Sequence, residues 1–367
     1  MDDREYMLYA LQLAEKGKGF VNPNPMVGAV IVKEGQIIGQ GYHEIYGGLH
    51  GERNALASCT QSPIGSTLYV TLEPCCHYGK TPPCTDAILQ SGIKKVVIGS
   101  KDPNPLVSGK GIELLRSRGV ECLDGILQTE CDRLNEVFFH YIRSKKPYVV
   151  MKYAMTMDGK TAAYTGKSKW ITGEAARLRV HEDRHRYQAV MAGVGTVIAD
   201  DPLLTCRLAK GKNPIRIICD TNLRTPLYSQ IVKTAKEVPT LLATSCSDKE
   251  KQKAYTDAGC SLLTVSRKQG HLDLNELMEQ LGAKEIDSIL LEGGGLLNWS
   301  ALQSNIVNKV QTYIAPKLLG GTKGKSPVSG IGMASPSQAY SLINRSITCL
   351  GEDILIESEV QYVYRNY

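Results

Sequence analysis

A histidine, a glutamate and two cysteines between positions 50 and 84 have the residue types and spacing of a metal site. His50 and Glu52 are separated by one residue, and Cys75 and Cys84 each follow a proline further along the chain. One imidazole and two thiolates suit zinc, and three protein ligands leave a fourth position open for water. We therefore predict one zinc ion per chain on His50, Cys75 and Cys84, with Glu52 carrying protons to and from a water that zinc activates.

A closed, structural zinc site is the alternative for the same residues. In that case Cys76 or His77 provides a fourth ligand, and Glu52 only faces solvent. We predict the open site because Glu52 lies at the expected start of a helix over 52–59. Cys75 and Cys84 are also expected near helix starts, where free backbone N–H groups favour the thiolate form.

Glycines in the C-terminal half indicate a second candidate site. Gly293, Gly294 and Gly295 come directly after Glu292, between an expected strand over 288–291 and an expected helix over 296–302. Glycines at such a turn allow phosphate oxygens to approach the backbone N–H groups of the helix start. The spacing differs from the dinucleotide fingerprint, so a plain tight turn is an equal alternative.

Short apolar runs alternate with helical patterns along the whole chain, which indicates an α/β layer structure. In the first half we expect strands over 27–33, 37–42, 67–72 and 95–99, and helices over 6–15, 52–59, 85–90, 111–118 and 129–143. In the second half we expect strands over 148–152, 189–194, 215–219, 240–244 and 288–291, with helices over 173–186 and 296–302.

The pattern breaks at Ser144-Lys145-Lys146-Pro147, directly before the strong strand that begins at Tyr148. We place a domain boundary there, giving domains 1–146 and 147–367. Each is long enough for its own core.

The composition is that of an ordinary globular protein. The chain of 367 residues has 43 Lys and Arg against 37 Asp and Glu, a net charge of +6. These charges are spread along the chain, which argues against a dedicated nucleic-acid surface. Because no apolar run is long enough for a membrane span and no secretory signal is visible, we expect a cytoplasmic protein whose 11 cysteines are free thiols or metal ligands.

The metal motif resembles that of the zinc nucleobase deaminases, which combine His-x-Glu with Pro-Cys and a second Cys. The eight residues between Cys75 and Cys84 make a longer loop than the usual one. This loop, the segment 22–28 (NPNPMVG) and the segment 101–105 (KDPNP) are similar to one family, the bifunctional deaminase–reductase of riboflavin biosynthesis. Segments 152–160, 168–172 and 195–202 resemble its reductase part. Cys76 departs from the serine expected in many relatives, and the proline before Cys75 favours Cys75 as the ligand.

The resemblance implies a cytidine-deaminase-like αβα domain followed by a dihydrofolate-reductase-like α/β domain. It implies a deaminase pocket lined by Asn24, His43, Lys80, Asp102 and Asn104. It further implies NADPH contacts at Ala154, Trp170, Thr196, Asp200, Gly294, Gly295, Leu296 and Leu297. Substrate contacts in the reductase would be Ser168, Arg184, Leu204, Arg207 and Glu292, with Lys152 beside the reacting carbon.

Several of these residues also have a purely structural interpretation. Asn24 and Asn104 lie in Asn-Pro turns, where asparagine is common for local hydrogen bonding. Lys80 could be an ordinary surface lysine, and Trp170 a core aromatic residue. Arg184 lies in a charged helix, where solvation is the default, and Lys152 could face solvent from the middle of a strand.

By this resemblance, the chain would deaminate a diaminohydroxyphosphoribosylaminopyrimidine with zinc and then reduce its ribosyl group to ribityl with NADPH. We expect a small-molecule substrate, a homo-oligomer, and no nucleic-acid or membrane partner. One competing class is a nucleic-acid-editing deaminase with an accessory domain, which the dispersed charge disfavours. Another is a non-catalytic protein scaffolded by zinc, which would release no ammonia.

Overall fold

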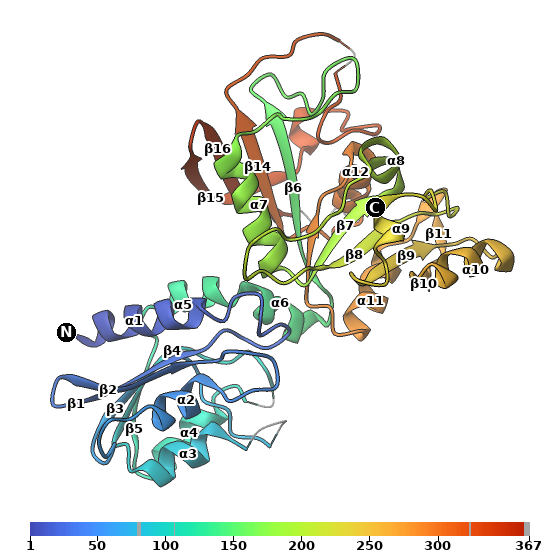
Figure 1. Cartoon of the computed structure of the whole chain (residues 1–367). Helices are drawn as coiled ribbons and strands as arrows, with labels where there is room; N and C mark the ends of the chain where they lie inside the picture. The colour runs from blue at the N-terminus through green and yellow to red at the C-terminus, as the bar shows by residue number, and fades with distance from the viewer. Residues whose placement is uncertain (79–81, 106, 323, 363–367) are drawn as a thin grey trace. The chain divides into compact units, whose positions relative to one another are not determined.

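Two compact units make up the chain, Met1–Lys145 and Lys146–Tyr367. The computed structural model describes residues 1–78, 82–105, 107–322 and 324–362 (Figure 1). Each unit contains a sheet flanked by helices, so the predicted α/β class is confirmed. Within these ranges, no helix combines the length and the apolar character that crossing a membrane requires.

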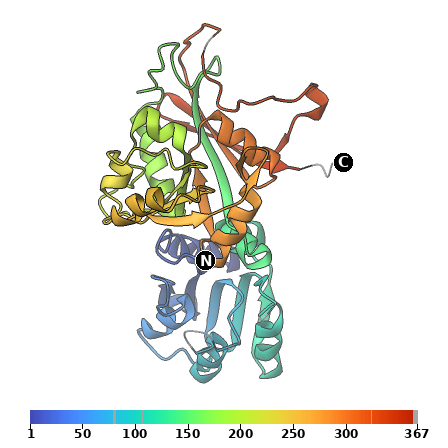
Figure 2. The same cartoon turned by 90° about the vertical axis from the view of Figure 1, so that its right-hand side faces the viewer.

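The first unit is a five-stranded sheet with strand order β2-β1-β3-β4-β5. Helices α1 and α5 cover one face, and α2, α3 and α4 cover the other (Figures 1 and 2). Its elements are α1 (Asp3–Glu15), β1 (Gly28–Lys33), β2 (Gln36–Tyr42), α2 (Gly51–Ala57), β3 (Thr67–Leu72), α3 (Cys84–Ser91), β4 (Lys95–Ser100), α4 (Lys110–Ser117), β5 (Glu121–Asp124), α5 (Gln128–Leu134) and α6 (Glu136–Ser144).

Strands β3, β4 and β5 run parallel, whereas β1 pairs antiparallel with both β2 and β3. The central strands β1, β3 and β4 are buried along almost their whole length, which explains their continuous apolar sequences. Gly41 in β2 allows α2 to pack closely, because a Cβ atom there would lie 2.3 Å from the Ala55 nitrogen. The sheet therefore fixes the helix that carries Glu52.

The helix expected over 129–143 is wrong as a single element, because the chain forms α5 and α6 with a break at Asn135. The buried Asn135 amide accepts a hydrogen bond from the Met26 N–H (2.8 Å) and donates one to the Met26 carbonyl (2.9 Å). It thereby holds the segment that carries Asn24. A helical repeat of apolar residues does not reveal this pairing, which depends on a residue far away in the sequence.

The second unit is built on a nine-stranded sheet with the order β10-β9-β8-β7-β13-β6-β14-β16-β15. Its elements are β6 (Tyr148–Thr156), α7 (Glu174–Arg186), β7 (Ala189–Gly193), α8 (Val194–Asp200), β8 (Ile215–Cys219), α9 (Gln230–Lys233), β9 (Thr240–Thr244), α10 (Lys249–Asp257), β10 (Ser261–Thr264), β11 (Arg267–Lys268), β12 (His271–Leu272), α11 (Leu274–Ala283), β13 (Ser288–Leu291), α12 (Gly295–Gln303), β14 (Lys309–Ala315), the 3-10 turn η1 (Pro336–Gln338), β15 (Ser341–Leu350) and β16 (Asp353–Gln361).

Register and packing assign the helices of this unit to two faces. Lys152 of β6 and Tyr313 of β14 lie on the sheet face covered by α7, α8, α9 and α10. Helices α11 and α12 pack on the opposite face, around Met151 and Leu291. The predicted strands β7, β8, β9 and β13 are confirmed, and β6 is longer than predicted. The antiparallel strands β15 and β16 were not predicted, because β15 is exposed at nearly every position and has no apolar alternation.

Two candidate active sites

In the first unit, three metal-binding atoms converge from three separate segments. His50 is the residue before α2, Cys84 is the first residue of α3, and Cys75 lies in the loop after β3. The His50 Nδ1 atom lies 3.6 Å from the Cys75 Sγ atom and 3.4 Å from the Cys84 Sγ atom. All three donor atoms lie within 4.8 Å of one another, a spacing that one metal ion can bridge.

The two cysteines affect each other's pKa in opposite directions. The hydrogen bond from the Cys84 thiol lowers the pKa of Cys75 to about 4, against the opposing effect of burial. The same hydrogen bond and burial raise the pKa of Cys84. Cys75 was predicted to lie near a helix start. It begins no helix itself, but its sulfur accepts a hydrogen bond from the first N–H of α3 at 3.3 Å. The cluster therefore concentrates thiolate charge where a cation would bind.

Glu52 fits the role of a proton carrier beside such a cation. It lies in the first turn of α2 and its side chain is buried, with 3% exposed. Among the described residues its Oε2 atom has no hydrogen-bond partner, although burial normally requires one. Burial raises the pKa of Glu52, which makes this carboxylate a better proton acceptor. The donor set and the unsatisfied oxygen together fit zinc with an activated water.

Of the other predicted pocket residues, His43 contacts this cluster, and Asp102 lies close enough for the charge of Cys75 to act on it. The His43 ring meets the His50 ring edge to face, with centroids 5.3 Å apart, and burial lowers the pKa of His43. Asp102 is buried directly after β4, and burial raises its pKa to about 6. The Asn104 N–H donates to Asp102 Oδ1 at 2.8 Å. Asn24 lies half-buried in the segment held by Asn135, and Lys80 lies outside the described residues.

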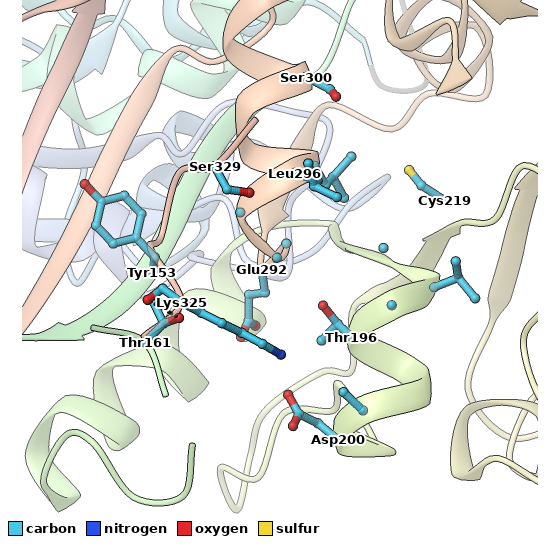
Figure 3. Close-up of a pocket in the computed structure, with 18 of the residues that line it drawn as sticks. Tyr153, Thr161, Thr196, Asp200, Cys219, Glu292, Leu296, Ser300, Lys325 and Ser329 are labelled. Carbon is cyan, nitrogen blue, oxygen red and sulfur yellow. Dashed lines mark hydrogen bonds between the residues drawn. The ribbon is translucent and has the colours of Figure 1, made fainter. Parts of the chain in front are cut away.

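The second unit contains a cavity of about 970 Å³ at the carboxyl ends of its parallel strands. Such edges of open α/β sheets are where ligands bind. Twelve predicted residues line it: Lys152, Ala154, Ser168, Arg184, Thr196, Asp200, Leu204, Glu292, Gly294, Gly295, Leu296 and Leu297. Figure 3 shows Thr196, Asp200, Glu292 and Leu296 facing this cavity, with Lys325 extending toward Thr196.

A largely buried ion pair, with 12% of each side chain exposed, lies among the residues that line this cavity. The Arg184 guanidinium donates to both Glu292 oxygens, at 2.6 Å and 3.0 Å. Burial alone would raise the pKa of Glu292, but the charges of Arg184 and Lys152 outweigh it and hold the pKa at about 2. The Lys152 ammonium lies 3.9 Å from Glu292, and burial lowers its pKa. Arg184 and Lys152 are therefore largely buried and line the cavity, with 12% and 16% of their side chains exposed.

Two predicted residues do not line the cavity. The side chain of Trp170 is 63% exposed and stacks on Arg177, whose guanidinium carbon lies 4.6 Å from the ring centroid. It is therefore not a core aromatic residue. Arg207 is exposed as well.

Sequence reasoning missed one end of the cavity, which is lined by Thr221, Asn222, Arg224 and His271. The first three follow β8, a strand that was predicted. The rule that parallel strands bind ligands at their carboxyl ends could therefore have pointed to them. No motif of known spacing marks these residues.

Together the two units define a class of protein, a two-domain enzyme with a metal-dependent hydrolytic site and a separate cofactor cavity. Residues 1–100 match the family model described as the cytidine and deoxycytidylate deaminase zinc-binding region. Residues 147–356 match the model described as the RibD C-terminal domain. The chain belongs to the RibD family of riboflavin biosynthesis proteins, and it is a bifunctional enzyme with a zinc-binding deaminase domain and a reductase domain consistent with NADPH use.

Individual relatives cover almost the whole chain. A riboflavin biosynthesis protein RibD from Actinobacillus pleuropneumoniae is 54% identical over 357 residues, 97% of this chain and 95% of that protein. The structure of RibD from Acinetobacter baumannii superimposes with a TM-score of 0.87 at 34% identity, covering 98% of this chain and 99% of that one. A structure from Thermotoga maritima superimposes with a TM-score of 0.86 at 38% identity, covering 98% of this chain and 99% of that one. It is described as a diaminohydroxyphosphoribosylaminopyrimidine deaminase/5-amino-6-(5-phosphoribosylamino)uracil reductase. The expected family and the expected pair of folds, cytidine-deaminase-like and dihydrofolate-reductase-like, are confirmed.

The ligand set can be tested by metal analysis of the purified protein. Cys84→Ser is expected to weaken zinc binding by at least about 10–100-fold, because a serine hydroxyl replaces a thiolate ligand. Cys76→Ser is the matched control, and it should retain about one zinc ion per chain. Full zinc content in Cys84→Ser, or its loss only in Cys76→Ser, would contradict the assignment.

Proposed function

We propose that the chain releases ammonia from a diaminohydroxyphosphoribosylaminopyrimidine and then reduces the ribosyl group of the product to a ribityl chain. The observation that carries the first step is the unpaired, buried Glu52 oxygen beside the His50, Cys75 and Cys84 donors. The second step is supported by the buried Arg184–Glu292 pair and Lys152 in a cavity large enough for a dinucleotide. The printed description of the Thermotoga relative supports the substrate.

In the deamination, zinc supplies a water whose pKa is lowered to about 7 when the ion is bound. Glu52 would accept a proton from this water as the water oxygen attacks the amino-bearing ring carbon, and it would pass that proton to the neighbouring ring nitrogen. Glu52 would then carry the remaining hydroxyl proton to the amine, so that the C–N bond breaks, ammonia leaves and a carbonyl remains. His43 and Asp102 orient the ring, and Asn24, Lys80 and Asn104 complete the pocket.

When bound in the cavity, NADPH would be the hydride source for the ribosyl carbon that is bonded to nitrogen. The glycines before α12 bring backbone N–H groups to the cofactor phosphates. Glu292 holds Arg184 and Lys152 in the cavity wall. Lys152 supplies a proton to the sugar oxygen that is released as the ring opens. Ala154, Thr196, Asp200, Leu296 and Leu297 contact the cofactor, and Ser168 and Leu204 contact the substrate. Trp170 and Arg207 lie outside the cavity lining, so their contacts with cofactor and substrate stay predictions.

Arg224, which lines the cavity, suggests how NADPH is preferred over NADH. Its guanidinium takes part in none of the hydrogen bonds or ion pairs found among the described residues. The acidic lining residues, Asp200 and Glu292, belong to other segments. A guanidinium that forms no ion pair among the described residues suits the extra phosphate of NADPH.

We further propose a cytoplasmic homo-oligomer. None of the 11 cysteines forms a disulfide, which is the state that a reducing compartment maintains. Strand β15 is the edge of the large sheet and exposes Leu342, Ile343 and Ile347, so a second copy could pair with it.

Glu52→Gln tests the proton carrier. Glutamine keeps the shape but cannot exchange protons, so deamination should fall about 10²–10⁴-fold while zinc content is unchanged. Reduction of supplied deaminated substrate should continue at the normal rate. Glu44→Gln, a change at an exposed glutamate, is the control. Normal ammonia release by Glu52→Gln would exclude Glu52 as the carrier.

Separate expression tests whether the reductase activity belongs to domain 147–367 alone, without domain 1–146. Residues 147–367 contain the whole nine-stranded sheet and its cavity, so this fragment should fold and oxidise NADPH with deaminated substrate. Circular dichroism and NADPH absorbance provide the measurements. A folded fragment that neither binds NADPH nor reduces the substrate would count against the assignment.

Arg224→Ala tests cofactor preference. Removing a charge-assisted hydrogen bond should raise the KM for NADPH about 10–100-fold and leave the KM for NADH nearly unchanged. Arg4→Ala, at an exposed position in the first unit, serves as a control of equal charge change. An equal rise in both KM values would assign Arg224 to a part of the cofactor that NADPH and NADH share.

A further inference from the structure

A third buried carboxylate in the first unit has no role in the proton transfers described above. Glu73 directly follows β3, and only 3% of it is exposed. None of the ion pairs found in the described part of the chain includes it. A buried carboxylate without a cation needs several hydrogen-bond donors to offset its lost hydration.

Backbone N–H groups provide these donors. One Glu73 oxygen, Oε2, accepts from Asp102 at 3.3 Å and from Gly109 at 3.0 Å. The other, Oε1, accepts from Gly111 at 3.0 Å and from Ile112 at 3.2 Å. The last two belong to the first turn of α4, where N–H groups lack partners within the helix. One side chain thus holds both ends of the loop between β4 and α4.

The same contacts join this loop to the metal-binding segment. Glu73 and Pro74 immediately precede Cys75, and the Glu73 N–H donates to the Ser100 carbonyl at 2.9 Å. A Cβ atom on Gly111 would lie 2.2 Å from the Pro74 carbonyl oxygen, so α4 starts directly against this segment. The position of Asp102 relative to Cys75 therefore depends on Glu73.

We propose that Glu73 is a positioning residue for the deaminase, which holds Asp102 and Asn104 at the correct place relative to the metal ligands. This inference rests on the proposed deaminase function. The negative charge is essential, since all four groups that face the Glu73 oxygens are donors. A glutamine there would turn its own NH₂ group toward two of these N–H groups.

Glu73→Gln in the full-length enzyme tests the proposal, with Glu113→Gln as the matched control because Glu113 is an exposed glutamate of α4. Misplacement of a binding group by about 1 Å can cost about 10²-fold. We expect kcat/KM for deamination to fall about 10–10²-fold in Glu73→Gln, mainly through KM. Zinc content and reductase activity should stay at wild-type values. Hydrogen exchange over residues 101–112 should accelerate in Glu73→Gln but not in Glu113→Gln.

Wild-type deaminase KM and unchanged exchange in Glu73→Gln would overturn the inference. So would a fall in kcat alone with KM unchanged. If Glu73→Gln loses zinc, Glu73→Asp is the variant that tests the proposal. The proposal requires that the enzyme with this shorter carboxylate keeps its zinc and has a raised KM for deamination. Zinc loss in Glu73→Asp, or a wild-type KM, would contradict the proposal. Absence of deaminase activity in the wild-type enzyme would instead refute the proposed function, and the exchange measurement would still report whether Glu73 holds the loop.

Discussion

Burial of carboxylates is the constraint on which both halves of this protein depend. Removing a carboxylate from water costs several kcal/mol unless donors or a cation replace the lost hydration. Glu292 is satisfied by a bidentate arginine and a nearby lysine, and Glu73 by four backbone N–H groups. Glu52 differs, because one of its oxygens is left without a partner among the described residues. The two satisfied carboxylates fix the surrounding structure, and the unsatisfied one is placed to move protons.

In both domains the site lies at the carboxyl ends of parallel strands. Parallel strands end at one edge of each sheet, and the residues that follow them meet there. In the first domain β3 leads to Cys75 and β4 leads to Asp102. In the second, β7, β8 and β13 lead to Gly193, Thr221 and Glu292 around one cavity. Chemistry on a zinc-activated water and chemistry on a bound nicotinamide therefore use similar scaffolds with different side chains.

The sequence predicted most of the buried parallel strands, because their apolar runs and flanking turns are local signals, but it did not predict the buried strand β14. The ligand set was also visible in the sequence, since His50, Cys75 and Cys84 lie in recognisable motifs. Three features depended on distant contacts and were missed. Asn135 interrupts a helix and pairs with Met26. Strand β15 is exposed along most of its length, so it shows no strand alternation. Arg224 lines the cavity but lies in a segment without a motif. Trp170 is a different case. The family resemblance predicted a contact with the cofactor, but it did not predict that Trp170 is exposed and stacks on Arg177.

The central claim is that one chain carries out two consecutive reactions at two sites. The most direct measurement is to incubate the zinc-loaded, full-length enzyme with the diaminohydroxyphosphoribosylaminopyrimidine substrate, with and without NADPH, and to follow ammonia and NADPH oxidation together. Without NADPH, the account predicts one ammonia per substrate and an intact ribosyl group. With NADPH, it predicts an equal amount of NADPH oxidised after ammonia release, with a ribityl product. NADPH oxidation without ammonia release, or ammonia release that NADPH oxidation never follows, would contradict it.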